Sequence, residues 1–369
     1  MKNTCFFNSA NFWGGGEKLH LEYALEFKKK NYHVFLVSNK NAPLSKKASA
    51  QGLEIFSVSV GNLSFLNPFK ILNLIRFYRK NEVDTVIFSA SQDLKLGGFS
   101  AKLAGVKNIV YLRGLAVPIK NNLINRFIFK SILTHIVANS DETKRTILKN
   151  LAEVVDEKNV KTIYHGIELK ESLFDQQNKL DIITQNARGV ILGNAGRLTP
   201  QKGQTHLVEL AKKLKDNKIE FTLFIAGTGE LQSELERLID KYELQNEVFL
   251  LGFVKDMDSF MNSIDVFLLS SIWEGFGYVL VEAMTKSKPV IAFDVSSNPE
   301  IVTSESGFLI DYADLDMFYE KTKLLITDES LRKRMGEAGK HKVIERFDLK
   351  DRITEFEYYL LGKLFKGDK

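Results

Sequence analysis

The chain has 369 residues, of which 44% are hydrophobic and 26% are charged. This length is too great for one typical core and suits two domains, and the composition is that of an ordinary globular protein. Residues 1–185 hold 26 Lys and Arg against 16 Asp and Glu, whereas the rest of the chain holds 25 against 30. The basic first half favours an anionic partner: nucleic acid, acidic lipid or a phosphorylated substrate.

Cys5 is the one cysteine, which excludes an internal disulfide and fits a reducing compartment. The opening MKNTCFFNSA contains no apolar h-region, so no secretory signal is expected. No stretch approaches the ~18 consecutive apolar residues that a membrane span needs. We therefore expect a cytoplasmic protein, either in the cytosol or peripheral to the inner face of the cell membrane.

The first predicted strand, Thr4–Phe7, is followed by the loop FWGGGEK, Phe12–Lys18, and then by a helical pattern. Glycines here let backbone N–H groups approach a ligand closely, and the helix amino end adds partial positive charge. Leu19 stands where the dinucleotide fingerprint needs a third glycine, and Lys18-Leu19 does not fit a P-loop. An anion site is the functional interpretation, and a tight turn without a ligand is the alternative.

Short β-branched and aromatic runs then alternate with helical patterns. This alternation predicts βαβ units and a parallel sheet covered on both faces. After a polar stretch at residues 173–188 the alternation begins again. The runs are HVFLV from His33, EIFSV from Glu54, DTVIF from Asp84, NIVYL from Asn108, HIVAN from His135, VILGNAG from Val190, FTLFIAG from Phe221, EVFLLG from Glu247, IDVFLLS from Ile264, KPVIAF from Lys288 and GFLI from Gly307.

This pattern predicts an α/β fold with two doubly wound, Rossmann-like domains, residues 1–180 and 181–347. Helices are expected over residues 314–327 and 330–345, and an amphipathic stretch follows from Leu349 to about Leu364. In open α/β sheets ligands bind beyond the carboxyl ends of the strands, so we expect the two domains to enclose a ligand cleft. The glycine loop would line that cleft.

The segment GRLTPQKG, residues 196–203, follows the first strand of the second domain and precedes a helical pattern. A lysine at a helix amino end opposes the macrodipole, so Lys202 needs an anion nearby. Together with Arg197 it would supply two cations for one phosphate pair. The alternative is that both side chains are solvated surface residues.

The loop SIWEGFGY, residues 271–278, follows a later strand and leads into the helical run YVLVEAM. Gly275 and Gly277 free the backbone for close approach to a ligand at that helix amino end. Glu282 lies among apolar neighbours, where a carboxylate is costly to bury, and sugar hydroxyls are suitable partners for it. An internal salt bridge or a solvated helix edge is the alternative.

Glu274 and Glu282 within EGFGYVLVEAM, with GRLTPQKG upstream, resemble the retaining nucleotide-sugar glycosyltransferases of family 4, which have the GT-B fold. The resemblance covers nearly the whole chain, and its motifs are specific when taken together. The other motifs that carry it are the GGGE loop, IVANS from Ile136, IYHGIE from Ile163, IAGTGEL, LGFVKD and KPVIAFDVSSNPEIV.

The resemblance implies a donor site that needs no cofactor and no bound metal. Arg197 and Lys202 would hold the donor diphosphate and neutralise the charge that grows as the sugar leaves. Glu274 would bind the donor sugar and Glu282 the ribose. The remaining implied donor contacts are backbone positions: Gly15 and Gly16 over the diphosphate, Gly196 beside Arg197, Gly275, Phe276 and Gly277 at the sugar or distal phosphate, and Gly229, Phe253 and Val254 at the nucleotide and base. Residues 348–369 resemble the terminal helix that returns to the first domain in this fold.

The chain departs from the family on the acceptor side. Many members have a histidine at the end of a middle strand of the first domain, whereas Arg113 stands in YLRG. Arg113 is the catalytic candidate there, to bind an acceptor anion or the leaving phosphate, but it does not deprotonate and is no general base. Asp93 is the other acid near a strand end, with helix capping as the alternative. His165, in YHGIE, is interpreted as a structural residue.

Two acidic pairs have the spacing of the Asp-x-Asp metal-binding motif. Both Asp256-Met257-Asp258 and Asp314-Leu315-Asp316 precede helical stretches, where acids cap the helix and favour its dipole. The histidines lack zinc-ligand spacing. We therefore expect helix caps at these positions and no metal site.

The function that follows is transfer of a hexosyl unit from a nucleotide sugar to a saccharide or lipid-linked acceptor, in surface polysaccharide or lipopolysaccharide assembly. The basic amphipathic segments at residues 63–81 and 117–133 allow peripheral contact with an anionic membrane, and ordinary packing helices are the alternative. No nucleic-acid-binding module is recognised. The other functions considered are a nucleotide-sugar-binding protein without transfer activity and a nucleotide-sugar epimerase.

Overall fold

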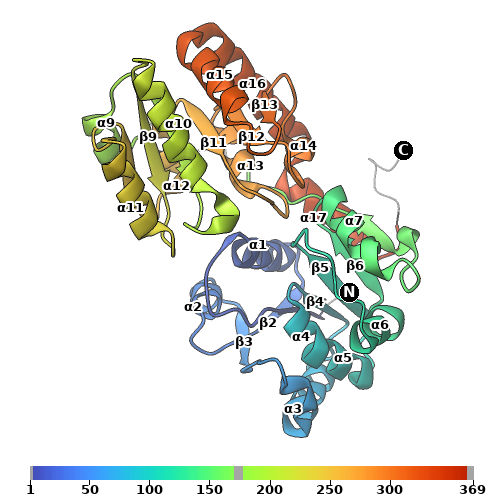
Figure 1. The fold of residues 1–369 in the computed structure, drawn as a ribbon. Coiled ribbons are helices and arrows are strands. Elements are labelled where there is room, and N and C mark those ends of the chain that lie inside the picture. The colour runs from blue at the N-terminus through green and yellow to red at the C-terminus, as the bar shows by residue number, and fades with distance from the viewer. Residues whose placement is uncertain (1–2, 170–177, 364–369) are drawn as a thin grey trace. The chain divides into compact units, whose positions relative to one another are not determined.

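The computed structural model describes residues 3–169 and 178–363. Among these, residues 3–165 and 350–363 form one compact unit, and residues 166–169 and 178–349 form a second. The two units are described separately below. Each contains one parallel sheet with helices on both faces (Figure 1), which confirms the predicted doubly wound architecture.

The first unit is built on a seven-stranded sheet with the order β3-β2-β1-β4-β5-β6-β7, and all its described pairings are parallel. Its strands are β1 Asn3–Phe7, β2 His33–Ser38, β3 Glu54–Ser57, β4 Thr85–Phe88, β5 Asn108–Arg113, β6 His135–Ala138 and β7 Val160–Thr162. Its helical elements are α1 Gly15–Lys29, α2 Pro43–Ala50, η1 Ser64–Leu66, α3 Pro68–Lys80, α4 Ser91–Asp93, η2 Leu94–Gly98, α5 Phe99–Ala104, α6 Leu123–Phe127, η3 Ile128–Ile132, α7 Asp141–Leu151, η4 Glu157–Asn159 and α17 Leu349–Leu360.

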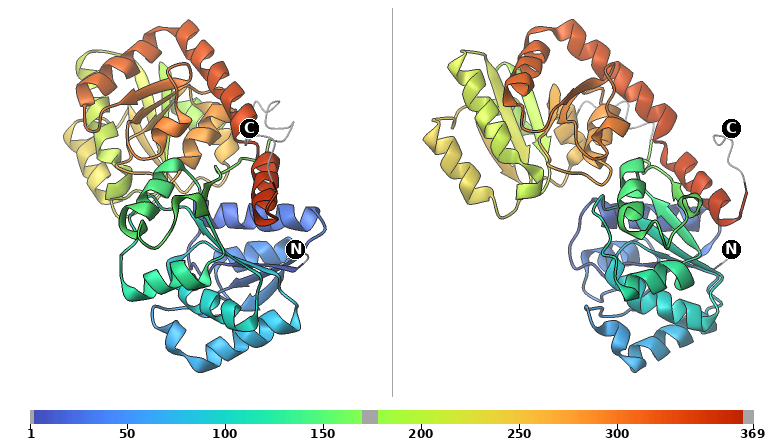
Figure 2. Two further views of the ribbon diagram at one scale, coloured as in Figure 1. Left: turned by 90° about the vertical axis from the view of Figure 1, so that its right-hand side faces the viewer. Right: turned by 45° about the vertical axis from the view of Figure 1, so that its right-hand side comes forward.

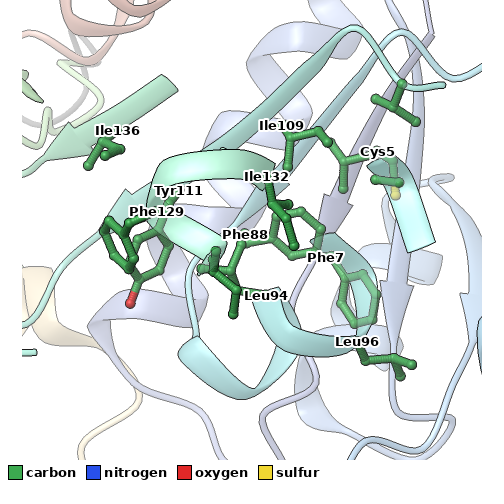
Figure 3. Packing of buried hydrophobic residues seen from close by; sticks show 14 of the residues in the cluster. Cys5, Phe7, Phe88, Leu94, Leu96, Ile109, Tyr111, Phe129, Ile132 and Ile136 are labelled. Atoms are coloured by element: carbon green, nitrogen blue, oxygen red, sulfur yellow. The ribbon is translucent and has the colours of Figure 1, made fainter. Parts of the chain in front are cut away.

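One face of this sheet is covered by the main hydrophobic cluster of the unit. Alternate residues of β1, Cys5 and Phe7, project into it, and side chains of α3, η2, α5, η3 and α7 close it. Figure 3 shows Phe7 and Phe88 side by side in this cluster, with ring centroids 5.4 Å apart. Burial raises the pKa of the Cys5 thiol far above its usual value, so the one cysteine is an apolar core residue.

The opposite face of the sheet is covered by α1 and the terminal helix α17 (Figure 2). Phe6 contacts Phe27 of α1, and Phe27 and Tyr23 both contact the buried ring of Phe356 in α17. Lys30 pairs with Glu357 at 2.7 Å. The terminal helix is therefore part of the core of the first unit.

The second unit is built on a six-stranded parallel sheet with the order β10-β9-β8-β11-β12-β13. Its strands are β8 Val190–Ala195, β9 Phe221–Ala226, β10 Val248–Gly252, β11 Val266–Leu269, β12 Val290–Phe293 and β13 Gly307–Ile310. Its helical elements are α9 Asp181–Asn186, η5 Pro200–Lys202, α10 Gln204–Asp216, α11 Gln232–Lys241, α12 Met257–Ser263, α13 Tyr278–Thr285, α14 Asn298–Ile301, α15 Leu315–Thr327 and α16 Glu329–Arg346.

Helices α10, α11, α15 and α16 contribute to the core cluster of this unit. The pair α13 and α16 packs closely because α16 carries glycines at the contact. A Cβ at Gly336 would lie 1.9 Å from the carbonyl oxygen of Ser287, and one at Gly339 would lie 3.2 Å from Met284. This packing fixes α13, which follows the EGFG loop.

The chain passes from the first unit to the second after His165, whereas the predicted boundary lies near residue 180. The division falls after His165 because Ile167 bridges to Asp348: its N–H donates to Phe347 O, and its carbonyl accepts from Leu349 N–H. Leu180 N–H donates to Ser263 Oγ, so residues 178–186 also join the second unit. None of the described helices combines the length and apolarity needed to cross a bilayer.

Candidate functional site

In the second unit, the segment after β8 is held in a compact turn. Gly196 N–H donates to Ala226 O at the end of β9, and Leu198 N–H donates to Thr228 O in the segment that follows. Pro200 begins the short helix η5, and Gly203 then adopts the left-handed conformation, with φ of 61°, before α10 starts. A Cβ at Gly203 would lie 2.4 Å from Ser270 O, so this position needs glycine. The turn places Lys202 immediately before the amino end of α10.

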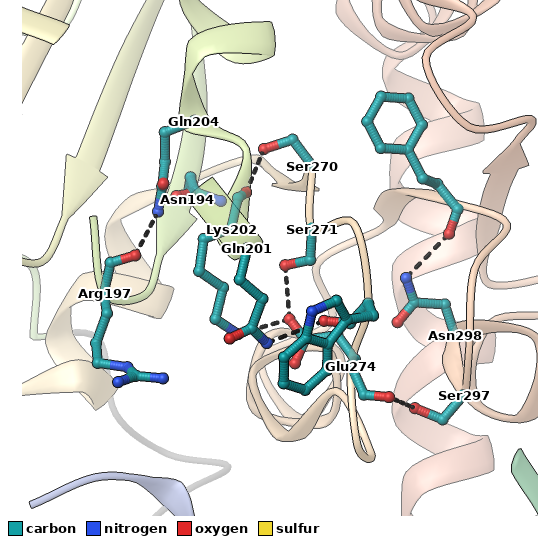
Figure 4. A network of polar contacts seen from close by, with 12 residues as sticks. Asn194, Arg197, Gln201, Lys202, Gln204, Ser270, Ser271, Glu274, Ser297 and Asn298 are labelled. Carbon is teal, nitrogen blue, oxygen red and sulfur yellow. Dashed lines mark hydrogen bonds and ion pairs between the residues drawn. The ribbon is translucent and has the colours of Figure 1, made fainter. Parts of the chain in front are cut away.

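The loop after β11 joins this turn through backbone and side-chain hydrogen bonds. Ile272 N–H donates to Gln201 O at 2.8 Å, and Gln201 Nε2 donates to Trp273 O at 3.0 Å. Ser270 Oγ donates to Lys202 O at 3.0 Å. The carboxyl ends of β8 and β11, which are neighbours in the sheet, therefore carry one connected polar network (Figure 4).

Lys202 and Glu274 form the centre of this network. Lys202 Nζ lies 2.6 Å from Glu274 Oε1, and the two side chains are only 16% and 9% exposed. The same carboxylate oxygen accepts from Ser271 Oγ at 2.6 Å, and Ser297 Oγ donates to the Glu274 carbonyl at 3.3 Å. Within the described residues Glu274 Oε2 has no hydrogen-bond partner. The anion that Lys202 was expected to need is thus supplied by this protein carboxylate.

Arg197 differs from Lys202 although both lie in the same turn. Its residue is exposed, and its guanidinium makes no ion pair or hydrogen bond with the described residues, whereas its carbonyl accepts from Gln204 Nε2 at 3.0 Å. In Figure 4 its side chain extends from the turn without a contact to the other residues shown. The second unit therefore presents an exposed cation beside a partly buried ion pair.

Two glycines near this turn have packing roles of their own. A Cβ at Gly229 would lie 2.3 Å from Leu198 O, and one at Gly227, which has φ of 147°, would lie 1.8 Å from Gly196 O. Close approach of the segments after β8 and β9 thus explains why Gly229 is glycine. The sequence predicts only a contact of Gly229 with the nucleotide and base.

The EGFG loop continues into α13. Gly277 precedes this helix in the left-handed conformation, with φ of 79°. The Phe276 ring is buried against Phe347, with ring centroids 5.5 Å apart, so this ring serves packing. Glu282 is half-buried in α13, in the same loop-helix unit as Gly275 and Glu274. Positions assigned to the base differ in exposure: Phe253 is 74% exposed and Val254 is half-buried.

In the first unit the glycine loop leads directly into α1, whose first residues are Gly15 and Gly16. Both are exposed, and a Cβ at either position would meet no heavy atom within 4 Å. Gly14 is the N-cap and offers no capping side chain. Packing within the unit therefore does not require these glycines, which favours the ligand interpretation over the tight turn.

Asp93 lies beneath the start of this loop. Its carboxylate is fully buried and accepts hydrogen bonds from Ser9 N–H, at 3.0 Å, and from Ser9 Oγ. Burial raises the pKa of Asp93 to about 6, the Ser9 hydrogen bonds oppose this increase, and the charge of Glu17 adds to it. Ala90, not Asp93, is the N-cap of α4, so the capping alternative is wrong. Asp93 instead joins the segments that follow β1 and β4.

Arg113 is the last residue of β5 and is buried. Its Nη1 donates to Tyr111 Oη at 2.7 Å and its Nη2 donates to Val117 O at 2.6 Å. Both terminal nitrogens are thus engaged within the unit, which the sequence did not reveal. His165 lies beside Asn139, 3.1 Å from its Nδ2, and burial lowers the pKa of His165 to about 3, which agrees with a structural, neutral imidazole.

In each acidic pair the first aspartate caps the following helix, as predicted, and the second lies in its first turn. Asp256 accepts from Ser259 N–H at 3.0 Å, and this bond lowers its pKa, while Asp314 accepts from Met317 N–H at 2.9 Å. Over residues 3–169 and 178–363, no three His, Cys, Asp or Glu side chains gather as metal ligands would. The absence of a metal from the reaction stays a prediction.

Sequence reasoning missed the polar side chains that position the ion pair. These are Gln201, Gln204, Ser271 and Ser297, each of which donates to the turn after β8 or the loop after β11. The available signal was their place at strand ends, where polar residues interrupt apolar runs. Their partners could not be inferred, because each bond joins segments far apart in the sequence or depends on the turn geometry.

Residues 175–342 match the sequence model of the family described as glycosyl transferases group 1. The chain is 25% identical over 344 residues to the Escherichia coli UDP-Gal:alpha-D-GlcNAc-diphosphoundecaprenol alpha-1,3-galactosyltransferase, covering 88% of each chain. It is 26% identical over 313 residues to the Campylobacter jejuni N-acetylgalactosamine-N,N'-diacetylbacillosaminyl-diphospho-undecaprenol 4-alpha-N-acetylgalactosaminyltransferase, covering 81% of this chain and 82% of that one.

Among solved structures, Anabaena HepE in complex with UDP and glucose has a TM-score of 0.84 at 19% identity, covering 98% of this chain and 100% of that chain. The sucrose-phosphate synthase of Thermosynechococcus elongatus has a TM-score of 0.77 at 15% identity, covering 98% and 99%. These likenesses confirm the predicted GT-B fold.

Proposed function

We propose that the chain belongs to the glycosyl transferases group 1 family and transfers a hexosyl unit from a nucleotide-diphosphate sugar to a hydroxyl group with retention of configuration. Residues 175–342 match the model of this family, and the chain has the GT-B fold. The observation that carries this proposal is the group formed by Arg197, Lys202 and Glu274 at the carboxyl ends of β8 and β11. Ligands of doubly wound sheets bind at such ends.

In this proposal the cations act on the leaving group. Arg197 is exposed and has no partner among the described residues, so it can meet a phosphate oxygen without breaking an internal bond. Lys202 adds a second charge from the amino end of α10. Negative charge grows on the diphosphate as the glycosidic bond breaks, and fixed cations lower the energy of that state more than that of the bound substrate. No metal ion is required for this step.

Glu274 would orient the sugar. Its Oε1 is held by Lys202 and Ser271, which leaves Oε2 to accept from sugar hydroxyls. Glu282, on the helix that follows, would bind the ribose. The other assigned donor contacts, including Gly15 and Gly16 of the first unit, stay predictions. The departing phosphate would accept the proton of the acceptor hydroxyl on the same face of the ring, since Arg113 cannot act as a base.

For the acceptor we propose a lipid-linked saccharide in surface polysaccharide assembly, at the cytoplasmic face of the cell membrane. The printed names of the Escherichia coli and Campylobacter jejuni relatives both include a diphosphoundecaprenol-linked acceptor. The basic first half of the chain suits an acceptor that carries phosphate. HepE was solved with UDP, so UDP-sugars are the first donors to test.

The test is a thermal-shift screen against UDP-, GDP-, ADP- and dTDP-sugars with EDTA present, followed by a transfer assay with the donor that stabilises the protein. We expect one nucleotide class to raise the unfolding temperature and to support transfer without added metal. Donor binding without transfer or donor hydrolysis would favour the nucleotide-sugar-binding protein. An absolute need for Mn²⁺ would contradict the mechanism.

An epimerase is less well supported. That reaction needs acid and base side chains that reach the sugar, and the acids near the glycine loop are Asp93 and Glu17, which are 0% and 8% exposed. Conversion of the donor sugar to its epimer in the same assay would nevertheless overturn the transferase proposal.

A further inference from the structure

The first unit contains a groove that is lined by residues of helix α3 and of the edge strand β3. It has a volume of about 780 Å³. We call it the α3–β3 groove. Its lining residues are Phe35, Glu54, Ile55, Phe56, Asn73, Arg76, Phe77, Arg79, Lys80 and Asn81.

The floor of the α3–β3 groove is aromatic. Phe56 of β3 stacks on Phe77 of α3, with ring centroids 4.3 Å apart and planes inclined by 22°, and Phe35 meets Phe77 edge to face at 5.6 Å. Phe35 and Phe77 are buried, but Phe56 is only partly covered. The floor therefore offers apolar surface that no described part of the chain fills.

The rim of the groove is cationic. Arg76 and Lys80 lie one turn apart on α3, both exposed, and neither pairs with an acid among the described residues. Arg79 beside them donates to Leu103 O at 2.9 Å. The one acid of the lining, Glu54, is paired with His33 at 2.7 Å, and the sequence has no acid between Glu54 and Glu82.

Helix energetics alone do not explain this arrangement. Cations in the last turn complement the helix dipole, which accounts for Arg79 and Lys80. Arg76 lies outside that turn, and like charges four residues apart repel each other unless an anion lies between them. An aromatic floor is likewise unnecessary for a surface whose charged side chains only face water. Both features together fit a ligand with an anionic group and an apolar part.

The groove is separate from the donor side of the unit. Glu54 is the first residue of β3, and Asn81 follows α3, where its carbonyl accepts from Asn3 Nδ2 at the start of β1. These residues lie at the amino ends of the strands, whereas the glycine loop and Asp93 follow the carboxyl ends of β1 and β4. The groove is thus a second site on the unit.

Exposed apolar side chains continue from the groove along the same segment. Leu63, Leu66, Phe69 and Leu72 are 70%, 65%, 76% and 47% exposed. They precede Arg76: Leu63 is the N-cap of η1, Leu66 lies on η1, and Phe69 and Leu72 lie on α3. Exposed leucine and phenylalanine beside unpaired Arg and Lys are typical of elements that lie in a membrane interface. They favour a lipid over a free phosphate compound as the ligand of the groove.

We propose that the α3–β3 groove binds an anionic phospholipid, with the phosphate at Arg76 and Lys80 and the first part of an acyl chain on Phe56 and Phe77. Leu66 and Phe69 then enter the lipid layer beside it. The choice of a lipid rests in part on the proposed lipid-linked acceptor, whereas binding of an anionic amphiphile rests on the groove alone. The lipid would hold the enzyme at the surface where such an acceptor lies.

The experiment compares flotation of the full chain with vesicles of phosphatidylcholine alone and of equal parts phosphatidylcholine and phosphatidylglycerol. We expect binding only to the anionic vesicles. Arg76→Glu/Lys80→Glu should weaken it by about thirtyfold or more, because each cation near an anionic surface contributes about fivefold. The matched control is Lys107→Glu/Lys149→Glu, which changes the net charge equally at exposed cations outside the groove and should weaken binding much less. Equal loss in both variants would overturn the assignment to the groove.

Soluble probes distinguish the lipid from a free phosphate. Calorimetric titration with dihexanoyl and dibutyroyl phosphatidylglycerol should give tighter binding for the longer chains, and glycerol 3-phosphate should bind far more weakly than either. Equal affinity for glycerol 3-phosphate, or no dependence on chain length, would overturn the proposal.

The outcomes also separate this inference from the proposed function. The groove variant should keep wild-type transfer to a soluble saccharide acceptor, since none of its residues is assigned to the donor site. Lipid binding by a protein that transfers no sugar would contradict the proposed function and leave the groove assignment standing. Sugar transfer by a protein that binds no lipid would contradict the groove assignment and leave the proposed function standing.

Discussion

Lys202 and Arg197 lie in one turn, but their side chains differ in burial and in ion pairing. Lys202 is mostly buried against Glu274, whereas Arg197 is exposed and unpartnered among the described residues. Removing Lys202 would leave a mostly buried carboxylate without its cation, which is costly. Removing Arg197 would leave no internal group unpaired. Stability and activity should therefore respond differently to the two substitutions.

We expect Lys202→Ala to lower the free energy of unfolding by about 3 kcal/mol, and Arg197→Ala to change it by less than about 0.5 kcal/mol. Both should reduce turnover about a hundredfold or more, because each removes a charge contact made in the transition state. Urea unfolding and a transfer assay measure the two effects. Arg237→Ala, an exposed cation on α11, is the matched control and should change neither. Full activity in Arg197→Ala would remove its assigned role.

Asp93 adds a pH-dependent contribution to stability. Its pKa is about 6 in the folded protein and 3.8 in the reference state, so the folded state binds the proton more tightly. Between about pH 4 and pH 6 the folded protein therefore holds more protons, and stability falls as pH rises. The resulting decrease in the free energy of unfolding is nearly complete once the pH is above 6, and it amounts to about 3 kcal/mol at neutral pH.

Asp93→Asn should remove this dependence. An amide can still accept from Ser9 N–H and donate to Ser9 Oγ, but it carries no buried charge. We expect the variant to gain stability relative to the parent as pH rises from 4 to 7, as measured by urea unfolding at several pH values. Parallel pH profiles for the two proteins would show that Asp93 titrates at its ordinary pKa.

At the scale of elements, α1 begins in a way that packing does not explain. Helices gain from Ser, Thr, Asp or Asn at the N-cap and lose stability with glycine in the first turn. This helix has glycine at its N-cap and at its first two positions, and the space around Gly15 and Gly16 is open. A sequence that departs from local preference without a structural reason indicates a functional one.

Gly15→Ala and Gly16→Ala should therefore leave stability unchanged or raise it by up to about 1 kcal/mol, because alanine favours the helix and restricts the unfolded chain. The same substitutions should lower turnover with the nucleotide sugar by about tenfold or more, since a methyl group would hold the reactants apart. Thermal unfolding and transfer kinetics test both parts. Gly61→Ala, in a loop where a Cβ makes only ordinary contact, is the control. Unchanged turnover in both variants would support the tight turn without a ligand.

Periodicity predicted most elements of this chain. The apolar runs that were read as strands became β1 to β6 and β8 to β13, and the three C-terminal helices lie within a few residues of their expected bounds. Strand β7, Val160–Thr162, was missed because three residues with alternating polarity give no recognisable run. Its parallel pairing with β6 decided the assignment. Short edge strands depend on their neighbours more than on their own sequence.

At the scale of the whole molecule, the C-terminal helix α17 belongs to the first unit although it follows the second in sequence. The ring of Phe356 is fully buried between Tyr23 and Phe27, so loss of this side chain opens a cavity in the first unit. The chain has two tryptophans, Trp13 in the first unit and Trp273 in the second. Each unit therefore has its own fluorescent reporter.

We expect Phe356→Ala to lower the stability of the first unit by about 3–5 kcal/mol, the usual cost of removing a buried phenylalanine ring. In a Trp273→Phe background the fluorescence of Trp13 should report an earlier unfolding transition, and in a Trp13→Phe background that of Trp273 should change less. Leu361→Ala, which removes a side chain that is 41% exposed, should shift neither transition appreciably. An equal shift of both reporters would contradict the assignment of α17 to the first unit alone.

The sequence by itself determined the two parallel α/β units and the segments from which the candidate site is built, because hydrophobic period, glycine loops and strand-end polar residues are local signals. Only the tertiary structure decided that Lys202 pairs with Glu274, that Asp93 holds Ser9, that Arg113 is engaged by Tyr111 and Val117, and that the chain leaves the first unit after His165 and returns to it at Lys350. The first two contacts join residues more than seventy positions apart. Such pairings depend on which strand ends become neighbours in the sheet, and on where turns direct the side chains, which no local pattern encodes.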